Sequence, residues 1–186
     1  MELKNLRGCI IGLVYDKYKE EKMTGLVKDI VTKKTLASLK MVGLAESLVD
    51  EDIGSLSRGE QNKVGLASKL LDDVIVLKDF SVGLTKKELT FYKRLFKKIS
   101  SYNKKIILID KNAELFIDLV DNIYVIDEDI LYETNDIYDA KLYDYIDKPF
   151  LVEFTMLSED YGVKLNHYYE LDELLKAIYR IKSWDT

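Results

Sequence analysis

The sequence predicts an α/β fold in which a small, mostly parallel sheet is covered by helices. Short apolar runs typical of buried strands recur along the chain, at 9–15, 74–77, 105–109 and 123–126. Segments with helical periodicity separate them, and strands that alternate with helices form parallel crossovers. The 186 residues, 47% of them hydrophobic, are enough for about one domain with a sizeable core.

Charge and cysteine content exclude several classes of protein. The net charge of −5 argues against nucleic acid as a partner. The single cysteine, Cys9, excludes an internal disulfide, and no apolar run is long enough to span a bilayer. We therefore expect a cytoplasmic protein that reaches a membrane only indirectly, through a partner.

The charges are unevenly distributed along the chain. Segment 86–105 holds eight basic residues against one acid, and segment 110–148 holds twelve acids against three lysines. Two interpretations stay open: these are solvated faces, or the basic segment is a patch for an anionic partner.

The first half of the chain predicts a strand and then helices. Run 9–15 is a buried strand that ends at Asp16. Helical periodicity from Thr24 to about Leu48 follows, with Gly43 placed as a C-cap.

Segment 54–71 predicts a polar turn that leads into an amphipathic helix. Ser57 is a good N-cap, and Glu60 completes a capping-box pattern. The free N–H groups and the dipole of such a helix end favour anions.

The second half alternates cleanly between strands and helices. Helix 86–100 is expected to bury Leu89, Tyr92, Phe96 and Ile99. The other expected elements are strands at 74–77, 105–109 and 123–126, a helix at 113–120, a short hairpin strand at 130–132, and tail helices at about 150–160 and 171–181.

Residues 9 to about 139 resemble the latter part of an ABC (ATP-binding cassette) ATPase domain, in the style of cobalt-uptake and energy-coupling-factor transporter ATPases. The segments that carry the resemblance are 11–16 (Q-loop strand), 42–44 with 56–61 (signature motif), 74–79 (Walker B), 82–85 (D-loop), 106–111 (switch strand) and 122–126 (the strand after it). The resemblance implies a truncated P-loop NTPase fold with three layers. It divides the chain into a domain at 1–139, with a helical signature subdomain at about 24–71, and a C-terminal helical extension at 140–186.

The chain departs from the family where nucleotide chemistry is performed. It contains no G-x-x-x-x-G-K-[ST], the sequence that cradles phosphates. By resemblance, Asp16 stands for the Q-loop glutamine, Lys78 for the metal-side aspartate, Asp79 for the catalytic glutamate, Thr85 for the D-loop aspartate and Lys111 for the switch histidine. An ammonium group at Lys78 would repel Mg²⁺. We therefore expect no catalytic residue, no metal site, and no ATP bound or hydrolysed by this chain alone.

The signature motif itself is nearly intact. In the family it contacts the γ-phosphate of nucleotide held by the opposite subunit, and the resemblance assigns that contact to Ser57, Arg58, Gly59 and Glu60. ATP and Mg²⁺ would then be supplied by a partner. The alternative is that Ser57–Gln61 is only a helix cap retained for folding.

The sequence leaves open three possible functions and two possible arrangements of the sheet. The chain is expected to regulate or complete a nucleotide site in an ABC ATPase subunit; alternatively it is a nucleotide-independent adaptor, or the C-terminal half of a split ATPase. In the resembled fold the Walker A strand lies between the switch strand and the strand after it. Without it, we expect a compact sheet in the order 9–15, 74–78, 105–109, 122–126; otherwise another chain covers the gap, and a homodimer is a further alternative.

Overall fold

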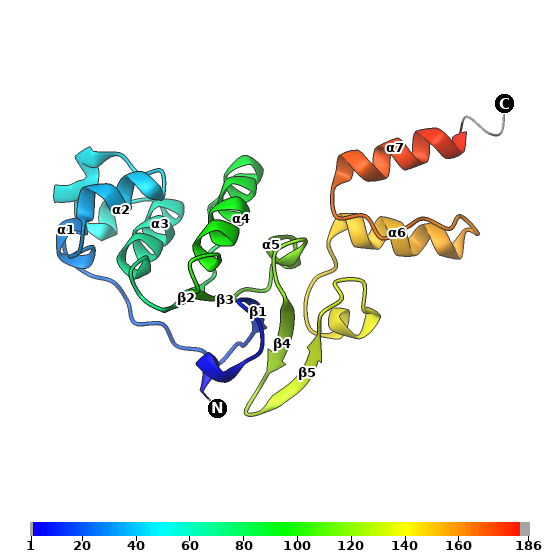
Figure 1. Cartoon of the computed structure of the whole chain (residues 1–186), viewed down its shortest axis with the longest axis horizontal. Helices are drawn as coiled ribbons and strands as arrows, with labels where there is room; N and C mark the ends of the chain where they lie inside the picture. Colours follow the sequence, from blue (N-terminus) through cyan, green and yellow to red (C-terminus); the bar gives the residue numbers. More distant parts are fainter. Residues whose placement is uncertain (1, 183–186) are drawn as a thin grey trace.

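The computed structural model describes residues 2–182, which form one five-stranded sheet with helices on one face (Figure 1). Every apolar run that predicted a strand is a strand. The strands are β1 (Ile10–Val14), β2 (Val74–Lys78), β3 (Lys105–Ile109), β4 (Asn122–Ile126) and β5 (Ile130–Thr134). The first four are parallel, and β5 pairs antiparallel with β4 as the expected hairpin. The predicted mostly parallel α/β fold is confirmed.

The order of the strands differs from the expected one. It is β2-β3-β1-β4-β5, so β1 lies between β3 and β4, with Gly12 opposite both Leu108 and Ile123. The prediction that β3 and β4 pair directly is therefore wrong. All five residues of β1 are buried, as a strand between parallel neighbours requires, whereas β2 alternates between buried and half-buried residues, as an edge strand does. This central place belongs to the Walker A strand in the resembled fold, which argues against reading 11–16 as the Q-loop strand.

Helices occupy most of the predicted segments, with two differences. The α-helices are α1 (Val27–Ile30), α2 (Thr35–Met41), α3 (Arg58–Lys69), α4 (Lys86–Ser100), α5 (Ala113–Phe116), α6 (Phe150–Asp160) and α7 (Leu171–Lys182); the 3-10 turns are η1 (Leu3–Asn5), η2 (Glu46–Asp50), η3 (Ile53–Ser55) and η4 (Ala140–Asp144). The helical segment 24–48 is broken because Lys34 has a left-handed backbone (φ +50°). Helix α5 ends four residues early, before the left-handed Asp118.

Gly43 ends α2 as predicted. Its φ is +73°, its N–H donates to the carbonyl of Lys40 (3.1 Å), and the next N–H, from Leu44, donates to that of Leu39 (2.9 Å). This pair of bonds is the Schellman motif, which satisfies carbonyls that the helix end would leave unpaired.

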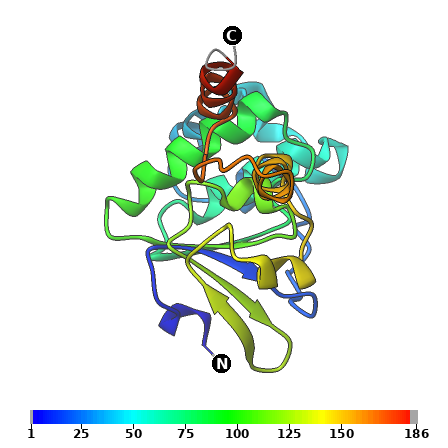
Figure 2. The ribbon, with the colours of Figure 1, turned by 90° about the vertical axis from the view of Figure 1, so that its right-hand side faces the viewer.

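The two faces of the sheet are covered differently. Helices α3, α4 and α5 lie on one face, where Phe80, Tyr92 and Phe96 form a buried aromatic cluster with ring centroids 5.0 and 5.2 Å from Phe80 (Figures 1 and 2). The other face packs against the half-buried Leu3, Tyr15 and Tyr18, from the N-terminal segment and the loop after β1. On α4, Tyr92, Phe96 and Ile99 are buried as expected, and Leu89 is partly buried.

The last two helices extend from the side of the sheet near α5 (Figure 1). They share a small apolar cluster of Leu151, Leu165 and Leu174. The main core also includes Leu142 and Val152, while the division at 139/140 stays a prediction. Among residues 2–182, no helix combines the length and apolar character that a bilayer crossing needs.

Candidate functional site

The turn at the start of α3 is closed by reciprocal hydrogen bonds. The Ser57 hydroxyl accepts from the Glu60 N–H (3.3 Å), and the Glu60 carboxylate accepts from the Ser57 N–H (2.9 Å) and hydroxyl (2.6 Å). The predicted capping box is therefore present. The Ser57 hydroxyl, followed by its N–H, lowers the pKa of the Glu60 carboxyl below its ordinary value. Both side chains are satisfied within their own turn.

Gly59 packs backbone to backbone against segment 82–85. A Cβ on Gly59 would lie 2.6 Å from the carbonyl oxygen of Gly83, closer than atoms can approach. Gly83 is left-handed (φ +81°), and a Cβ there would lie 2.8 Å from the Gly59 nitrogen. Neither position accepts a side chain without movement of the backbone, so the two turns are held as one unit.

Asn62 is a third attachment between these segments, and sequence reasoning missed it. Its buried side-chain amide donates towards the carbonyls of Asp79 (3.0 Å), Phe80 (3.3 Å) and Val82 (3.0 Å). The signal that could have found it is its position one turn after Gly59, on the face of α3 that enters the core. It fixes the course of the chain after β2.

The outer side of the turn faces solvent. Ser57 and Arg58 are exposed, Glu60 is half-buried and Gly59 is buried. Among residues 2–182, no hydrogen bond or ion pair engages the Arg58 side chain, so its guanidinium is available to an anion. The four predicted signature residues thus form one turn that offers one cation, because the Ser57 hydroxyl already donates its proton to Glu60.

Four of the five residues that the resemblance assigned to altered motifs lie together elsewhere, at the carboxyl ends of the parallel strands. Asp16 is one of them, although the place of β1 argues against its Q-loop assignment. Asp16, Lys78, Asp79 and Lys111 line one hollow of about 220 Å³. They come together because β1, β2 and β3 run in the same direction and end at the same edge. The fifth, Thr85, lies apart as the N-cap of α4.

Lysines hold the loop after β1 across this edge. The Lys78 ammonium donates to the carbonyl of Tyr18 (2.8 Å), and Lys69 donates to the carbonyl of Val76 (2.8 Å) and pairs with Glu20 (3.0 Å). Lys111 pairs with Asp16 at 2.9 Å, but both side chains are more than 60% exposed, so this pair adds little stability. No helix follows β1 until Val27.

A second carboxylate that the sequence analysis missed lies beside Asp79. Asp110 directly follows β3, is only 6% exposed, and accepts from the N–H groups of Asn112 (2.9 Å) and Ser81 (3.1 Å). Burial raises the pKa of its carboxyl above the ordinary value. An acid at the end of a buried strand is the signal that could have identified it.

Asp79 holds an unusual backbone position at the same edge. It is left-handed (φ +48°), and its N–H donates to the carbonyl of Ile109 (2.8 Å). This bond extends the pairing of β2 with β3 by one residue, so the Asp79 side chain leaves the sheet at its rim.

Comparison with known proteins identifies the fold. No family model and no curated protein matches the chain. Solved structures match at high probability, and they are ABC ATPase cassettes. A bacterial ABC transporter cassette, solved as a dimer, is 21% identical with a TM-score of 0.50, over 64% of this chain and 51% of its own. CbiO1 of Clostridium perfringens, part of the ABC transporter complex CbiONQ, is 20% identical with a TM-score of 0.47, over 67% of this chain and 57% of its own.

An archaeal ribosome recycling factor, solved with a ribosomal stalk protein, is also similar. It is 19% identical with a TM-score of 0.51, over 66% of this chain and 27% of its own. The chain spans about half the length of the two transporter cassettes described above. At these identities the likeness to the structures with TM-scores of 0.50 and 0.51 shows the fold alone, which is that of part of an ABC ATPase cassette.

Proposed function

We propose that this chain is a non-hydrolysing ABC ATPase-like protein that regulates or completes a nucleotide site in an ABC-type ATPase partner. Its contact would be the turn of Ser57, Arg58, Gly59 and Glu60. The observation that carries the proposal is a contrast within the molecule. The signature-like turn is closed, exposed and rigidly attached, while the sheet edge that would hold the chain's own nucleotide carries Lys78 and Lys111 among its aspartates.

The sheet edge does not fit a magnesium nucleotide. Asp16, Asp79 and Asp110 supply carboxylate oxygens at this edge, but the Lys78 ammonium crosses it to the Tyr18 carbonyl and would repel Mg²⁺. A phosphate cradle needs a helix N-terminus directly after the central strand, whereas the chain from 15 to 26 contains no helix. Phosphoryl transfer depends on positioning and charge stabilisation. A chain without both the Mg²⁺ site and the phosphate cradle therefore has no mechanism for it.

A partner in trans fits the turn better than a second copy does. Among the described residues the Arg58 guanidinium has no partner and is suited to a phosphate oxygen, whereas the Ser57 hydroxyl would donate to one only by giving up its bond to Glu60. A homodimer would bring two such turns together with no cradle for nucleotide. The partner we propose therefore supplies the phosphate loop, ATP and Mg²⁺ itself.

The adaptor alternative also has an observation in its favour. The Gly59–Gly83 contact and the capping box explain on folding grounds alone why this turn is kept. The split-ATPase alternative is less favourable. A Walker A strand from another chain would enter between β3 and β4, and β1 already pairs with both.

Two measurements test the proposal. ATP hydrolysis by the purified chain with Mg²⁺ should be absent, and hydrolysis that Asp79→Asn abolishes would overturn the non-hydrolysing assignment. Capture of partners from the source cells should recover an ABC ATPase only with ATP and Mg²⁺. Arg58→Glu should abolish that recovery, and Lys87→Glu, an exposed charge reversal on α4, should not. If the partner is recovered equally well without ATP and with the Arg58→Glu variant, the adaptor alternative is favoured.

A further inference from the structure

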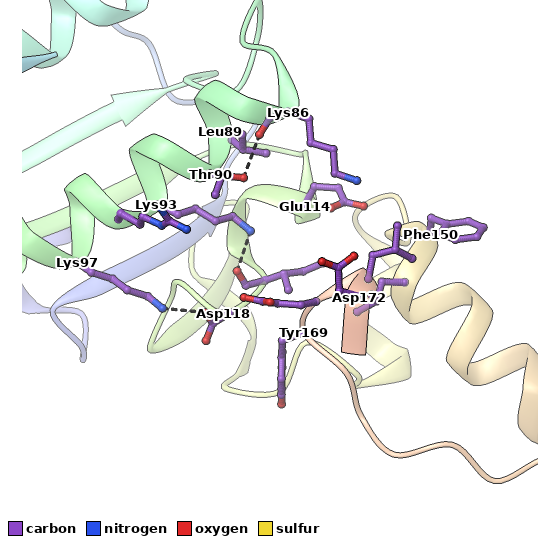
Figure 3. A pocket seen from close by; sticks show the side chains of 15 residues that line it. Lys86, Leu89, Thr90, Lys93, Lys97, Glu114, Asp118, Phe150, Tyr169 and Asp172 are labelled. Atoms are coloured by element: carbon purple, nitrogen blue, oxygen red, sulfur yellow. Dashed lines mark hydrogen bonds and ion pairs between the residues drawn. The ribbon is translucent and has the colours of Figure 1, made fainter. Parts of the chain in front are cut away.

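A second cavity lies away from the signature turn, where the C-terminal helices meet α4 and α5 (Figure 3). Its volume is about 480 Å³, within the range of small-molecule sites. Leu89 of α4, Ile117 after α5 and Leu151 of α6 form apolar parts of its wall, and Phe150 and Tyr169 add aromatic rings. The proposed function assigns no role to this cavity.

Lys93, in the middle of α4, is the unusual group in this cavity. Its side chain extends from the helix to the far wall, where the ammonium donates to the carbonyl of Ile117 (2.9 Å; Figure 3). Among the described residues, no carboxylate lies within ion-pair distance of it. One turn later, Lys97 pairs with Asp118 at 2.8 Å. Lys93 therefore carries three donors with one protein acceptor, in a half-buried position.

Burial makes Lys93 easier to deprotonate than an exposed lysine. Loss of solvent around the amine lowers the pKa of Lys93 to about 8. Glu114 and Asp118 oppose this shift by favouring the ammonium, and Lys97 adds to it. The remaining charged groups that line the cavity are Lys86 and Arg94 on α4, and Glu170 and Asp172 around the start of α7. Near neutral pH, a larger fraction of Lys93 than of an exposed lysine is the neutral, nucleophilic amine.

The same wall of α4 carries cations that can bind an anion. Lys86 and Lys93 lie on one face of the helix, and Arg94 follows directly. Among the described residues, neither the Lys86 ammonium nor the Arg94 guanidinium has an ion-pair partner. A ligand that reaches Lys93 can therefore place a phosphate or carboxylate against these two cations.

We propose that this cavity binds small aldehydes or ketones that carry an anionic group, and that Lys93 joins them as an imine. The neutral Nζ attacks the carbonyl carbon, a C–N bond forms, and the carbonyl π electrons move to the oxygen, which takes a proton. The carbinolamine then loses that oxygen as water, whose two hydrogens come from the amine, and a C=N bond remains. The step needs no oxidant or reductant and is reversible by hydrolysis.

The test uses pyridoxal 5′-phosphate as the aldehyde, with borohydride to trap the imine and peptide mass spectrometry to locate it. With limiting aldehyde at about pH 7.5, Lys93 should be labelled about tenfold faster than Lys98, an exposed lysine on the same helix. Lys93→Arg, which keeps a positive charge and N–H donors but has no nucleophilic amine, should remove this fast label. Lys98→Arg should leave it unchanged.

A matched probe tests the anion-binding part. 5-Deoxypyridoxal has the same aldehyde without the phosphate, so Lys86→Gln with Arg94→Gln should slow labelling by the phosphate compound several-fold and leave the other unchanged. The rate at Lys93 in the unmodified chain should rise to half its maximum near pH 8. Labelling spread evenly over the lysines, or a midpoint near pH 10 at Lys93, would overturn the proposal, and neither outcome depends on whether a variant folds.

Discussion

Helices α3 and α4 begin with the same capping box, one inside the signature-like segment and one outside it. In both, the cap N–H donates to the glutamate, at 2.9 Å for Ser57 and 2.8 Å for Thr85. Both glutamate N–H groups return a bond of 3.3 Å to the cap hydroxyl. Cap chemistry alone therefore does not distinguish a phosphate-contacting motif from an ordinary helix start.

The two caps differ in what holds them to the rest of the molecule. The first is fixed through backbone, by the contact of Gly59 with Gly83. The second is fixed through charge, by an ion pair between Glu88 and Lys63 of α3. A turn held by backbone keeps its shape while its side chains face a partner. A turn held by charge responds to pH.

The largest effect should follow from breaking the backbone contact. Gly59→Ala places a methyl group 2.6 Å from the Gly83 carbonyl, so one of the two turns must move, and we expect a loss of about 2–3 kcal/mol in the free energy of unfolding. The control is Gly43→Ala. Gly43 is left-handed but has no atom within 4 Å of an added Cβ, so only the backbone cost of about 1–2 kcal/mol applies. Urea unfolding measures the free energy of unfolding of both variants. Equal losses would show that the Gly59–Gly83 contact yields to a methyl group without further cost.

A smaller and nearly equal effect should follow from removing either cap. Ser57→Ala and Thr85→Ala each lose the bonds of one hydroxyl and should cost about 1 kcal/mol by urea unfolding. Because the two variants are matched in stability, they separate folding from binding. Under the proposed function, Ser57→Ala should weaken ATP-dependent recovery of the partner and Thr85→Ala should not. Equal weakening would mean that only stability matters.

The comparison also shows how far the sequence predicts this molecule. The strands were predictable because buried runs such as 105–109 are apolar at almost every position, and both caps follow from short-range pattern. The strand order was not predictable, because any of these apolar runs would pack well in the middle of a sheet. The one usable signal was that β1 is apolar or small at every position, whereas β2 ends in Lys78.

The candidate site was predictable in part. The gathering of Asp16, Lys78, Asp79 and Lys111 follows from strand ends that meet at one edge. Asn62 was missed because its acceptors are carbonyls 17 to 20 residues away, which no local pattern connects to it. The same holds for one of the two donors to Asp110, the Ser81 N–H, which is 29 residues distant. Contacts of this kind become visible only when the chain path is known.

The smallest predicted effect concerns the ion pair between Glu88 and Lys63, which holds the cap of α4. The ion pair with Lys63, followed by the Thr85 bonds, lowers the pKa of Glu88 from 4.5 to about 2. A carboxyl whose pKa is depressed by folding stabilises the fold above its unfolded pKa, so this contribution is present above about pH 4.5 and is lost as the pH falls towards 2. The Glu88 side chain is 34% exposed, so solvent screening should keep the loss below about 1 kcal/mol.

Glu88→Gln should therefore flatten the dependence of stability on pH between about pH 4.5 and 2, as followed by urea midpoints. Glu60→Gln is the matched control, because the Glu60 carboxylate makes the same cap bonds and forms no ion pair among the described residues. It should flatten the profile less. If the two variants behave alike, the charge between α3 and α4 adds nothing to the cap, and the two helix starts are equivalent in energy as well as in geometry.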